Sequence, residues 1–165
     1  MEQLDLFEKL NTEEKTACAF TGHRELKDDF SPKKLEEAII AQLEEGVRVF
    51  YNGMAMGFDL LAAEYVLECK KKYEDVKLIA CIPCLNQEKY FSDKDKKRYV
   101  SVLKKCDEQV LVSESYYNGC MQKRDRYMVD RADVLITYCK KSKGGTAYTV
   151  RYFKKKYPKK PILFL

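Results

Sequence analysis

The sequence predicts an α/β protein in which helices cover both faces of a parallel sheet. Short, continuously apolar runs alternate with amphipathic stretches along most of the 165 residues, and such runs are typical of strands buried on both sides. Glycines follow several of these runs, where a strand would leave the sheet for a turn or a helix. A chain of this length suits one domain, which we place at residues 15–165, after an N-terminal extension at residues 1–14.

The first half of the chain predicts three strands and two helices. A compact, mostly apolar run at 16–20 indicates the first strand. Ser31 is a good N-cap and Pro32 suits the first helical position, so a helix begins there, and its apolar spacing continues until Gly46. The elements that follow are a strand at 47–51, a loop at 53–57, a helix at 58–72 with a broad apolar face, and a strand at 76–82.

The second half continues the alternation of strands and helices. A polar stretch at 86–95 follows the third strand, and a glycine-rich turn at 143–146 precedes the last helix. The predicted elements, in order, are a helix at about 93–106, a strand at 109–112, a helix at about 119–131, a strand at 134–138, a helix ending near residue 156, and a strand at 161–164.

Composition excludes several classes of protein. The chain is 45% hydrophobic and 35% charged, which is ordinary for a globular protein and too apolar for a disordered one. No run approaches the ~20 apolar residues of a membrane helix. The first five residues are partly acidic and lack the basic start of a signal peptide. We therefore expect a cytoplasmic protein with no membrane partner.

The seven cysteines predict neither a disulfide framework nor a metal site. Their number is odd, and a cytosolic chain of this size keeps its thiols reduced. Cys81 and Cys84 form a C-x-x-C pair, but Pro83 places the pair at the end of a strand instead of at a helix N-terminus, where a reactive thiolate would be stabilised. With a single histidine in the chain, zinc has too few ligands.

The net charge of +5 is mild, and the basic residues are concentrated near the end of the chain. The stretch 151–160 holds six basic residues and no acid. Such a tract can contact nucleic acid, but it also suits the solvated face of a last helix, whose C-terminus favours cations. The second interpretation is the simpler one.

The segments that follow the predicted strands carry most of the candidate chemistry. Ligands of open parallel sheets bind beyond the carboxyl ends of the strands, where the strand order reverses. Glycines in 21–24, 53–59 and 144–146 stand where a strand gives way to a turn or helix, and glycine lets backbone N–H groups approach a phosphate. A fourth segment, 122–125, carries an arginine and an aspartate. Each segment alone suits a plain turn, but their combination at one sheet edge favours a phosphate site.

Charged side chains in these segments have two interpretations each. Arg24 and Arg124 would add charge-assisted contacts to a phosphate. Asp59, in the first turn of a helix, either complements the helix dipole or accepts hydrogen bonds from ribose hydroxyls. Asp125 lies on an apolar helical stripe and needs a cationic partner, for which either arginine would serve. His23 would lie over the cleft, either as a structural side chain or in contact with the ligand.

After the third strand come Gln87, Tyr90 and Phe91, and an aromatic ring there would either stack on a base or pack the loop. No metal ligand is predicted. The candidate ligand-binding residues are Thr21, Gly22, His23, Arg24, Gly53, Met54, Gly57, Asp59, Gln87, Arg124, Asp125, Gly144, Gly145 and Thr146.

Taken together, the motifs at 21–24, 53–64, 122–125 and 144–146 resemble the YpsA-like branch of the SLOG superfamily, which also holds the DNA-processing protein DprA and the LOG proteins. The resemblance covers residues 15–165. It implies a Rossmann-like three-layer sandwich with a mostly parallel sheet. It also implies a bacterial or phage-associated binder of a nucleotide or nucleotide-derived ligand, such as NAD or ADP-ribose, with a regulatory, sensing role.

One departure from the LOG enzymes bears on catalysis. Those enzymes carry a Pro-Gly-Gly-x-Gly-Thr-x-x-Glu segment, whereas here Lys143 precedes two glycines and the catalytic glutamate has no counterpart. We therefore expect a binder more than an enzyme. The alternatives are an N-glycosidic hydrolase or transferase that uses Asp59, Asp125 or Glu64, and single-stranded DNA binding like that of DprA. The sequence specifies no oligomeric state.

Overall fold

The computed structural model describes residues 16–165, so the predicted extension at 1–14 lies outside the described residues. Six strands form one sheet in the order β4-β3-β2-β1-β5-β6, and every pairing between neighbouring strands is parallel. The strands are β1 (Ala17–Gly22), β2 (Val49–Asn52), β3 (Lys77–Ile82), β4 (Glu108–Leu111), β5 (Val134–Tyr138) and β6 (Ile162–Phe164). The helices are α2 (Pro32–Glu44), α3 (Phe58–Cys69), η1 (Gln87–Tyr90), α4 (Asp93–Lys105), α5 (Cys120–Asp130) and α6 (Gly145–Lys156).

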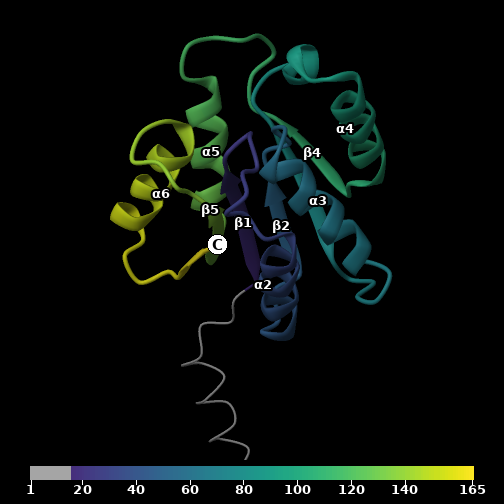
Figure 1. The fold of residues 1–165 in the computed structure, drawn as a ribbon, viewed down its shortest axis with the longest axis vertical. Coiled ribbons are helices and arrows are strands. Elements are labelled where there is room, and N and C mark those ends of the chain that lie inside the picture. The colour runs from purple at the N-terminus through teal and green to yellow at the C-terminus, as the bar shows by residue number, and fades with distance from the viewer. Residues whose placement is uncertain (1–15) are drawn as a thin grey trace, which may run out of the picture.

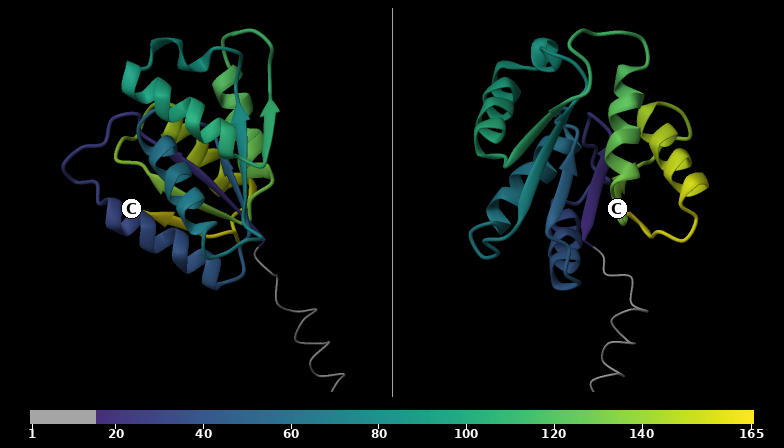
Figure 2. Two further views of the ribbon diagram at one scale, coloured as in Figure 1. Left: turned by 90° about the vertical axis from the view of Figure 1, so that its right-hand side faces the viewer. Right: turned by 180° about the vertical axis from the view of Figure 1, so that it is seen from behind.

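The helices form two layers, one on each face of the sheet (Figures 1 and 2). Helices α2, α3 and α4 pack on one face, and α5 and α6 pack on the other. Strand β1 is apolar on both of its faces because each face lies against a layer of helices. Cys18 and Phe20 pack in the core beneath α2, α3 and α4, and Ala19, between them, packs in the core beneath α5 and α6. The predicted α/β three-layer sandwich is therefore confirmed, with a sheet that is parallel throughout.

Most predicted elements lie where the sequence places them, but β1 extends further than predicted. The sequence pattern ends the first strand at residue 20, whereas Thr21 and Gly22 continue it by pairing with Thr137 and Tyr138 of β5. Helix α3 is shorter than predicted and ends at Cys69, with Lys70 as its C-cap. Among residues 16–165, no helix combines the length and apolar character needed to cross a membrane.

Strand β1 is the point at which the strand order reverses. The chain moves from β1 through β2 and β3 to β4 on one side, and then returns to the other side of β1 as β5 and β6. The carboxyl ends of β1 and β5 therefore lie next to each other, and the segments that leave them diverge over opposite faces of the sheet. In open α/β sheets this crevice is the usual ligand site.

Candidate functional site

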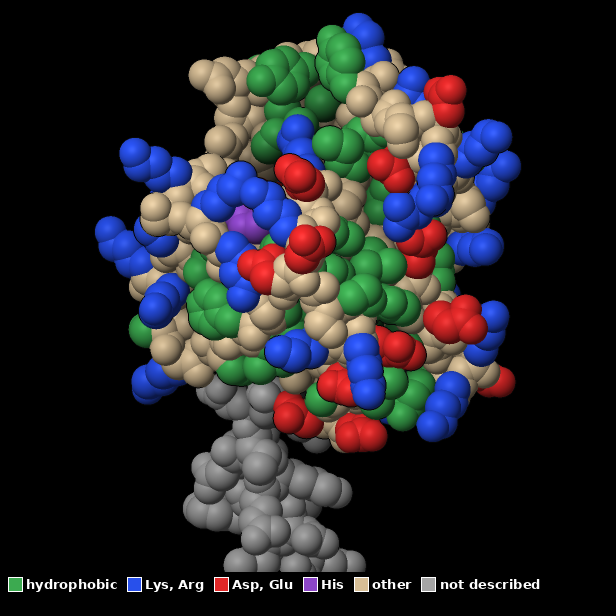
Figure 3. Space-filling view, in the orientation of Figure 1, with side chains coloured by type: hydrophobic (Ala, Val, Ile, Leu, Met, Phe, Trp, Pro, Cys, Tyr) green, Lys and Arg blue, Asp and Glu red, His purple; other side chains and the backbone are tan. Residues whose placement is uncertain are grey.

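A cavity of about 680 Å³ opens at the carboxyl ends of β1 and β5. Its lining comes from the loop after β1, the start of α3, the first turns of α5 and the loop from β5 into α6. In the space-filling view, the single histidine, His23, is surrounded by lysine and arginine side chains (Figure 3). The cavity therefore lies at the sheet edge where the strand-end motifs place a ligand site, and basic side chains stand around its mouth.

Two glycines let the segments around the cavity approach one another. A Cβ atom on Gly22 would lie 2.3 Å from the Phe58 ring, so only glycine lets the end of β1 pass the first residue of α3. Gly57 has φ of 79°, and a Cβ atom there would lie 2.1 Å from the Arg24 carbonyl oxygen. The Phe58 N–H donates to the His23 carbonyl oxygen at 3.2 Å and fixes the loop after β1 against α3.

The start of α6 forms the cationic end of the cavity. Gly144 is the N-cap, with φ of 99°, and it provides no side-chain hydrogen bond to the first turn, which contains no acidic residue. Lys140, Lys141 and Lys143 stand exposed just before it and line the same cavity. The free N–H groups of a helix start carry partial positive charge, so this end of the cavity favours an anion such as phosphate.

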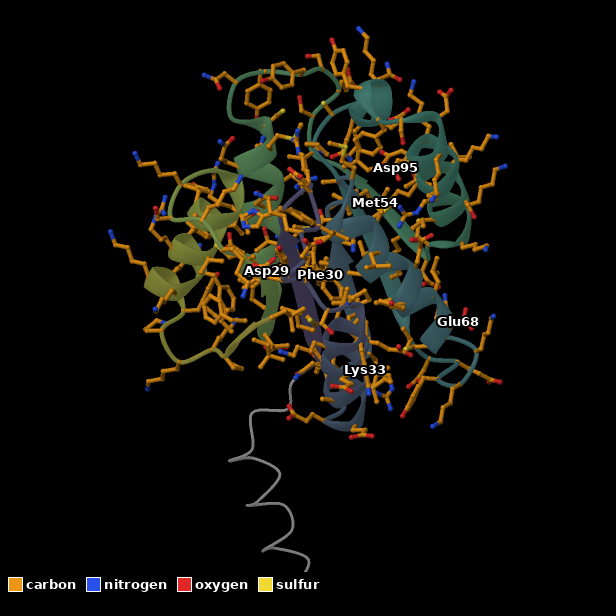
Figure 4. The ribbon with its side chains drawn as sticks, viewed as in Figure 1. Asp29, Phe30, Lys33, Met54, Glu68 and Asp95 are labelled. Atoms are coloured by element: carbon orange, nitrogen blue, oxygen red, sulfur yellow. The ribbon has the colours of Figure 1, made fainter. Side chains whose placement is uncertain are left out.

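Hydrogen bonds hold the loops after β1 and β5 together beside this cationic end. The Lys140 N–H donates to His23 Nε2 at 2.8 Å, and the histidine ring packs edge-on against Tyr138 with centroids 5.2 Å apart. The Tyr138 hydroxyl donates in turn to the Asp29 carboxylate. Asp29 and Phe30 lie side by side in front of β1 and β5 (Figure 4). Burial, with added repulsion from Lys141 and Lys27, lowers the pKa of His23, which matches its role as a neutral acceptor.

The floor of the cavity is a buried network centred on Arg124. Its Nε atom donates to Asp125 Oδ1 at 2.6 Å, and its Nη1 atom donates to the Gly53 carbonyl and, at 3.3 Å, to Gln87 Oε1. The Thr149 hydroxyl donates to Asp125 Oδ2 at 2.9 Å. The predicted need of Asp125 for a cationic partner is thus met by Arg124. Because most of the guanidinium donors are used within the protein, Arg124 mainly holds the floor together.

Asp59 is the second acid of the floor and is only partly satisfied. It lies in the first turn of α3, is 5% exposed and lines the cavity. Its Oδ2 atom accepts from the Ala55 N–H at 3.3 Å, while Oδ1 has no hydrogen-bond partner. Burial raises the pKa of Asp59 to about 7; the Asp125 charge adds to this effect and Arg124 opposes it.

The structure brings ten of the fourteen predicted site residues to the cavity. Those ten are Thr21, Gly22, His23, Arg24, Asp59, Arg124, Asp125, Gly144, Gly145 and Thr146. The other four, Gly53, Met54, Gly57 and Gln87, lie outside its lining. Met54 is fully buried in the core, and Figure 4 shows it between β2 and α3. Gly53 and Gln87 support the floor from behind, since the Gln87 amide donates to the Gly53 carbonyl at 3.2 Å and both contact Arg124.

Several lining residues were not predicted from the sequence. They are Glu25, Lys27, Asp29, Ala55, Met121, Tyr138, Lys140, Lys141 and Lys143. The lysines have a recognisable signal, because three of the four residues before Gly144 are basic and directly precede a helix start. The remaining residues reach the cavity through tertiary contacts that no local pattern reveals.

Other sequence candidates lie away from the cavity. The Glu64 carboxylate pairs with Arg98 of α4, and Glu64 does not line the cavity. The basic tract begins at Arg151 in the middle of α6, continues past the end of the helix, and contributes no residue to the cavity lining. Within the tract, Lys156 pairs with Asp130 at 3.1 Å. Tyr90 is 87% exposed on η1, also outside the lining.

The cysteine pair lies at the end of β3, outside the cavity lining. Cys81 is fully buried on β3, and burial raises the pKa of its thiol to about 12, which disfavours a reactive thiolate. Cys84 is buried as well, and both are free thiols. Within residues 16–165, no group of three or more His, Cys, Asp or Glu side chains is arranged to hold a metal ion.

Comparisons with known proteins agree with this architecture. The YpsA family model, described as the YspA SLOG family, matches residues 20–164. A UPF0398 protein of Halalkalibacterium halodurans is 30% identical over 132 residues, covering 78% of this chain and 70% of that protein. The SPbeta prophage-derived protein YoqJ of Bacillus subtilis is 30% identical over 141 residues, covering 75% and 82% of the two chains.

Two solved structures share the fold. DNA processing protein A (DprA) of Streptococcus pneumoniae has a TM-score of 0.63 at 18% identity, with 90% of this chain matching 50% of that chain. DprA of Helicobacter pylori, whose structure is described for its single-stranded DNA binding mode, has a TM-score of 0.62 at 21% identity, over 92% and 66% of the two chains. The described fold thus corresponds to only part of each DprA chain.

Proposed function

The chain belongs to the YspA SLOG family, and we propose that it binds a nucleotide-derived small molecule in the cavity between β1 and β5. In this proposal it acts in the cytoplasm as a regulatory sensor of that molecule and does not turn it over. The observation that carries the proposal is the contrast between the two ends of one cavity. The rim carries lysines and the uncapped N-terminus of α6, whereas the floor holds the acids Asp59 and Asp125 together with Arg124.

A phosphate group fits the rim. The first turn of α6 offers unpaired N–H groups, and Lys140, Lys141 and Lys143 add positive charge within reach of a bound anion. A Cβ atom on Gly144 or Gly145 would meet no other atom within 4 Å, so the space in front of this turn is open. Several cations suit a ligand with more than one phosphate charge, as in NAD or ADP-ribose.

The size of the cavity favours a small molecule. Its volume of about 680 Å³ lies within the range of roughly 300–1,000 Å³ that is usual for small-molecule sites. Arg151, the first residue of the basic tract at 151–160, donates to the Ser142 carbonyl at 2.8 Å, but no residue of the tract lines the cavity. A long polyanion would need a continuous basic groove to follow its backbone.

Two measurements test the proposal. Native mass spectrometry of the purified protein should detect a co-purified nucleotide-derived ligand. Calorimetric titration with AMP, ADP, NAD and ADP-ribose should then yield at least one measurable affinity. The Lys140→Ala/Lys141→Ala variant should weaken that affinity, whereas Lys154→Ala/Lys155→Ala, at the far end of the same helix, should not. Equal effects of the two double variants, or no binding by wild type, would contradict the proposal.

A second candidate function is cleavage of the N-glycosidic bond of a nucleotide. The observation in its favour is Asp59, a buried carboxyl in the cavity with a pKa of about 7, because a general acid or base works best near the ambient pH. Chromatography of AMP, NAD or ADP-ribose after incubation with the protein tests it. Release of free base at about 1 per second or faster, lost in Asp59→Asn, would establish an enzyme.

Single-stranded DNA is the third candidate, favoured by the fold shared with the DNA-binding protein of Helicobacter pylori. Fluorescence anisotropy with a labelled oligonucleotide would detect it. DNA binding that competes with ADP-ribose would place the strand in the cavity, whereas binding lost in Lys154→Ala/Lys155→Ala would place it on the basic tract.

A further inference from the structure

One buried carboxylate oxygen in the cavity lining has no hydrogen-bond partner within the described protein. Three buried side-chain oxygens within residues 16–165 accept no hydrogen bond, and they belong to Gln42, Asp59 and Thr137. Of these residues only Asp59 lines the cavity. Buried carboxylate oxygens are normally hydrogen-bonded, because leaving one unpaired costs free energy. When Asp59 is ionised, Oδ1 therefore lacks a donor, and a molecule that enters the cavity can supply one.

The charges around Asp59 restrict what that molecule can present. Two carboxyl groups, Asp59 and Asp125, lie near one buried guanidinium, and of the two only Asp125 accepts a hydrogen bond from Arg124. When Asp59 is ionised, a phosphate placed against this floor would face its uncompensated negative charge. A hydroxyl group brings a donor without a negative charge, and two neighbouring hydroxyls can satisfy Oδ1 and the remaining lone pair of Oδ2.

We infer that Asp59 receives a free ribose diol, so that the cavity selects ribonucleotide-derived molecules whose 2′- and 3′-hydroxyls are both unesterified. This inference rests on the proposed function, because it takes the phosphate to lie at the start of α6 and the sugar to point inward toward α3. It also separates the ligand from DNA. Inside a DNA strand the sugar lacks the 2′-hydroxyl and its 3′-oxygen is esterified, so neither position can donate to Asp59.

A series of ligands tests the inference on the wild-type protein, without any substitution. AMP and ADP are titrated beside their 2′-deoxy and 2′,3′-dideoxy forms under the same buffer conditions. Loss of hydrogen bonds to a charged acceptor should weaken the dideoxy forms by roughly tenfold to a hundredfold. Equal affinities for the ribose and dideoxy forms would overturn this inference and leave the proposed function intact. No binding by any nucleotide would overturn the proposed function, and this inference with it.

Variants then assign the preference to one side chain. In Asp59→Ala, and to a lesser degree in Asp59→Asn, the ratio of the ribose to the dideoxy affinity should fall toward one. The matched control is Asp28→Asn, which removes an exposed carboxylate from the loop after β1, outside the cavity lining, and should keep the wild-type ratio. If both Asp59 variants kept the wild-type ratio of ribose to dideoxy affinity, a residue other than Asp59 would be the one that recognises the ribose hydroxyls.

Discussion

The Nε atom of Arg124 lies 2.6 Å from Oδ1 of Asp125, its neighbour in the sequence, and both side chains are buried. Adjacent residues on a helix usually point in different directions, so this bond brings together two side chains that the helix alone would separate. The same guanidinium also donates to the Gly53 carbonyl, 71 positions away in the sequence. One side chain therefore joins α5 to the turns after β2 and β3, and the organisation of the cavity floor depends on it.

Replacing Arg124 should destabilise the protein strongly. Arg124→Met leaves Asp125 buried without its cation, and breaking a buried ion pair in this way costs about 3–5 kcal/mol. Urea unfolding measures the loss. The double variant Arg124→Met/Asp125→Asn should lose less than the sum of the two single variants, because it removes both charges. Additive losses would show that the two side chains do not act as a pair.

Asp59 should make stability depend on pH in an unusual direction. Its folded pKa of about 7 exceeds the ordinary value of 3.8, so the folded state holds the proton more tightly than the unfolded state. The stabilisation is present at about pH 4 and is lost as the pH rises to about 7, by at most roughly 4 kcal/mol at about 1.4 kcal/mol per unit.

The measurement is a set of denaturant titrations between pH 4 and pH 8 on wild type and Asp59→Asn. Asparagine cannot ionise, so the variant should gain stability relative to wild type as the pH rises. A constant difference between the two proteins across this range would contradict the raised pKa of Asp59.

Gly53→Ala should disturb the floor without touching the rim. A Cβ atom there would lie 2.8 Å from Cζ of Arg124, and the guanidinium would have to leave the Gly53 carbonyl. We expect a loss of about 1–3 kcal/mol in the free energy of unfolding. Gly145→Ala is the control for stability, since the added carbon meets nothing within 4 Å. Similar losses in both variants would point to a general effect of replacing glycine.

The Cys81→Ser/Cys84→Ser variant should keep ligand binding and lose no more than ~1–2 kcal/mol of stability, the scale of ordinary substitutions. The pair lies behind the cavity floor at the end of β3 and is not joined by a disulfide. Binding and thermal unfolding are measured with and without a reductant. A dependence of binding on the reductant, abolished in the variant, would reveal a redox role.

The sequence patterns predict the fold well because strand β1 and its neighbours are buried on both faces, and that burial leaves a continuous apolar run. The end of β1 is less predictable, since Thr21 and Gly22 join the strand only through pairing with β5. Gly53 shows a different limit. A glycine after a strand suggests a phosphate turn, but here its missing side chain makes room for Arg124, a contact made across the fold.

The rim lysines carry only a weak local signal. The run Lys140-Lys141-Ser142-Lys143 has the composition of an ordinary solvated surface, and only its position just before a helix start favours an anion site. Only the topology, with β5 beside β1, brings these lysines over the cavity. Position relative to the switch in strand order therefore carries information that residue type alone does not.

The hydrogen bond from Lys140 to His23, together with that from Tyr138 to Asp29, has a consequence for how a ligand enters. The two loops at the mouth are already fastened to each other in the free protein, so the entropy of ordering them is lost during folding and not at association. The site is in this sense preorganised. Its backbone should shift by no more than about 1 Å on binding, and the association rate should be set by electrostatic attraction to the lysine rim, falling as salt is added.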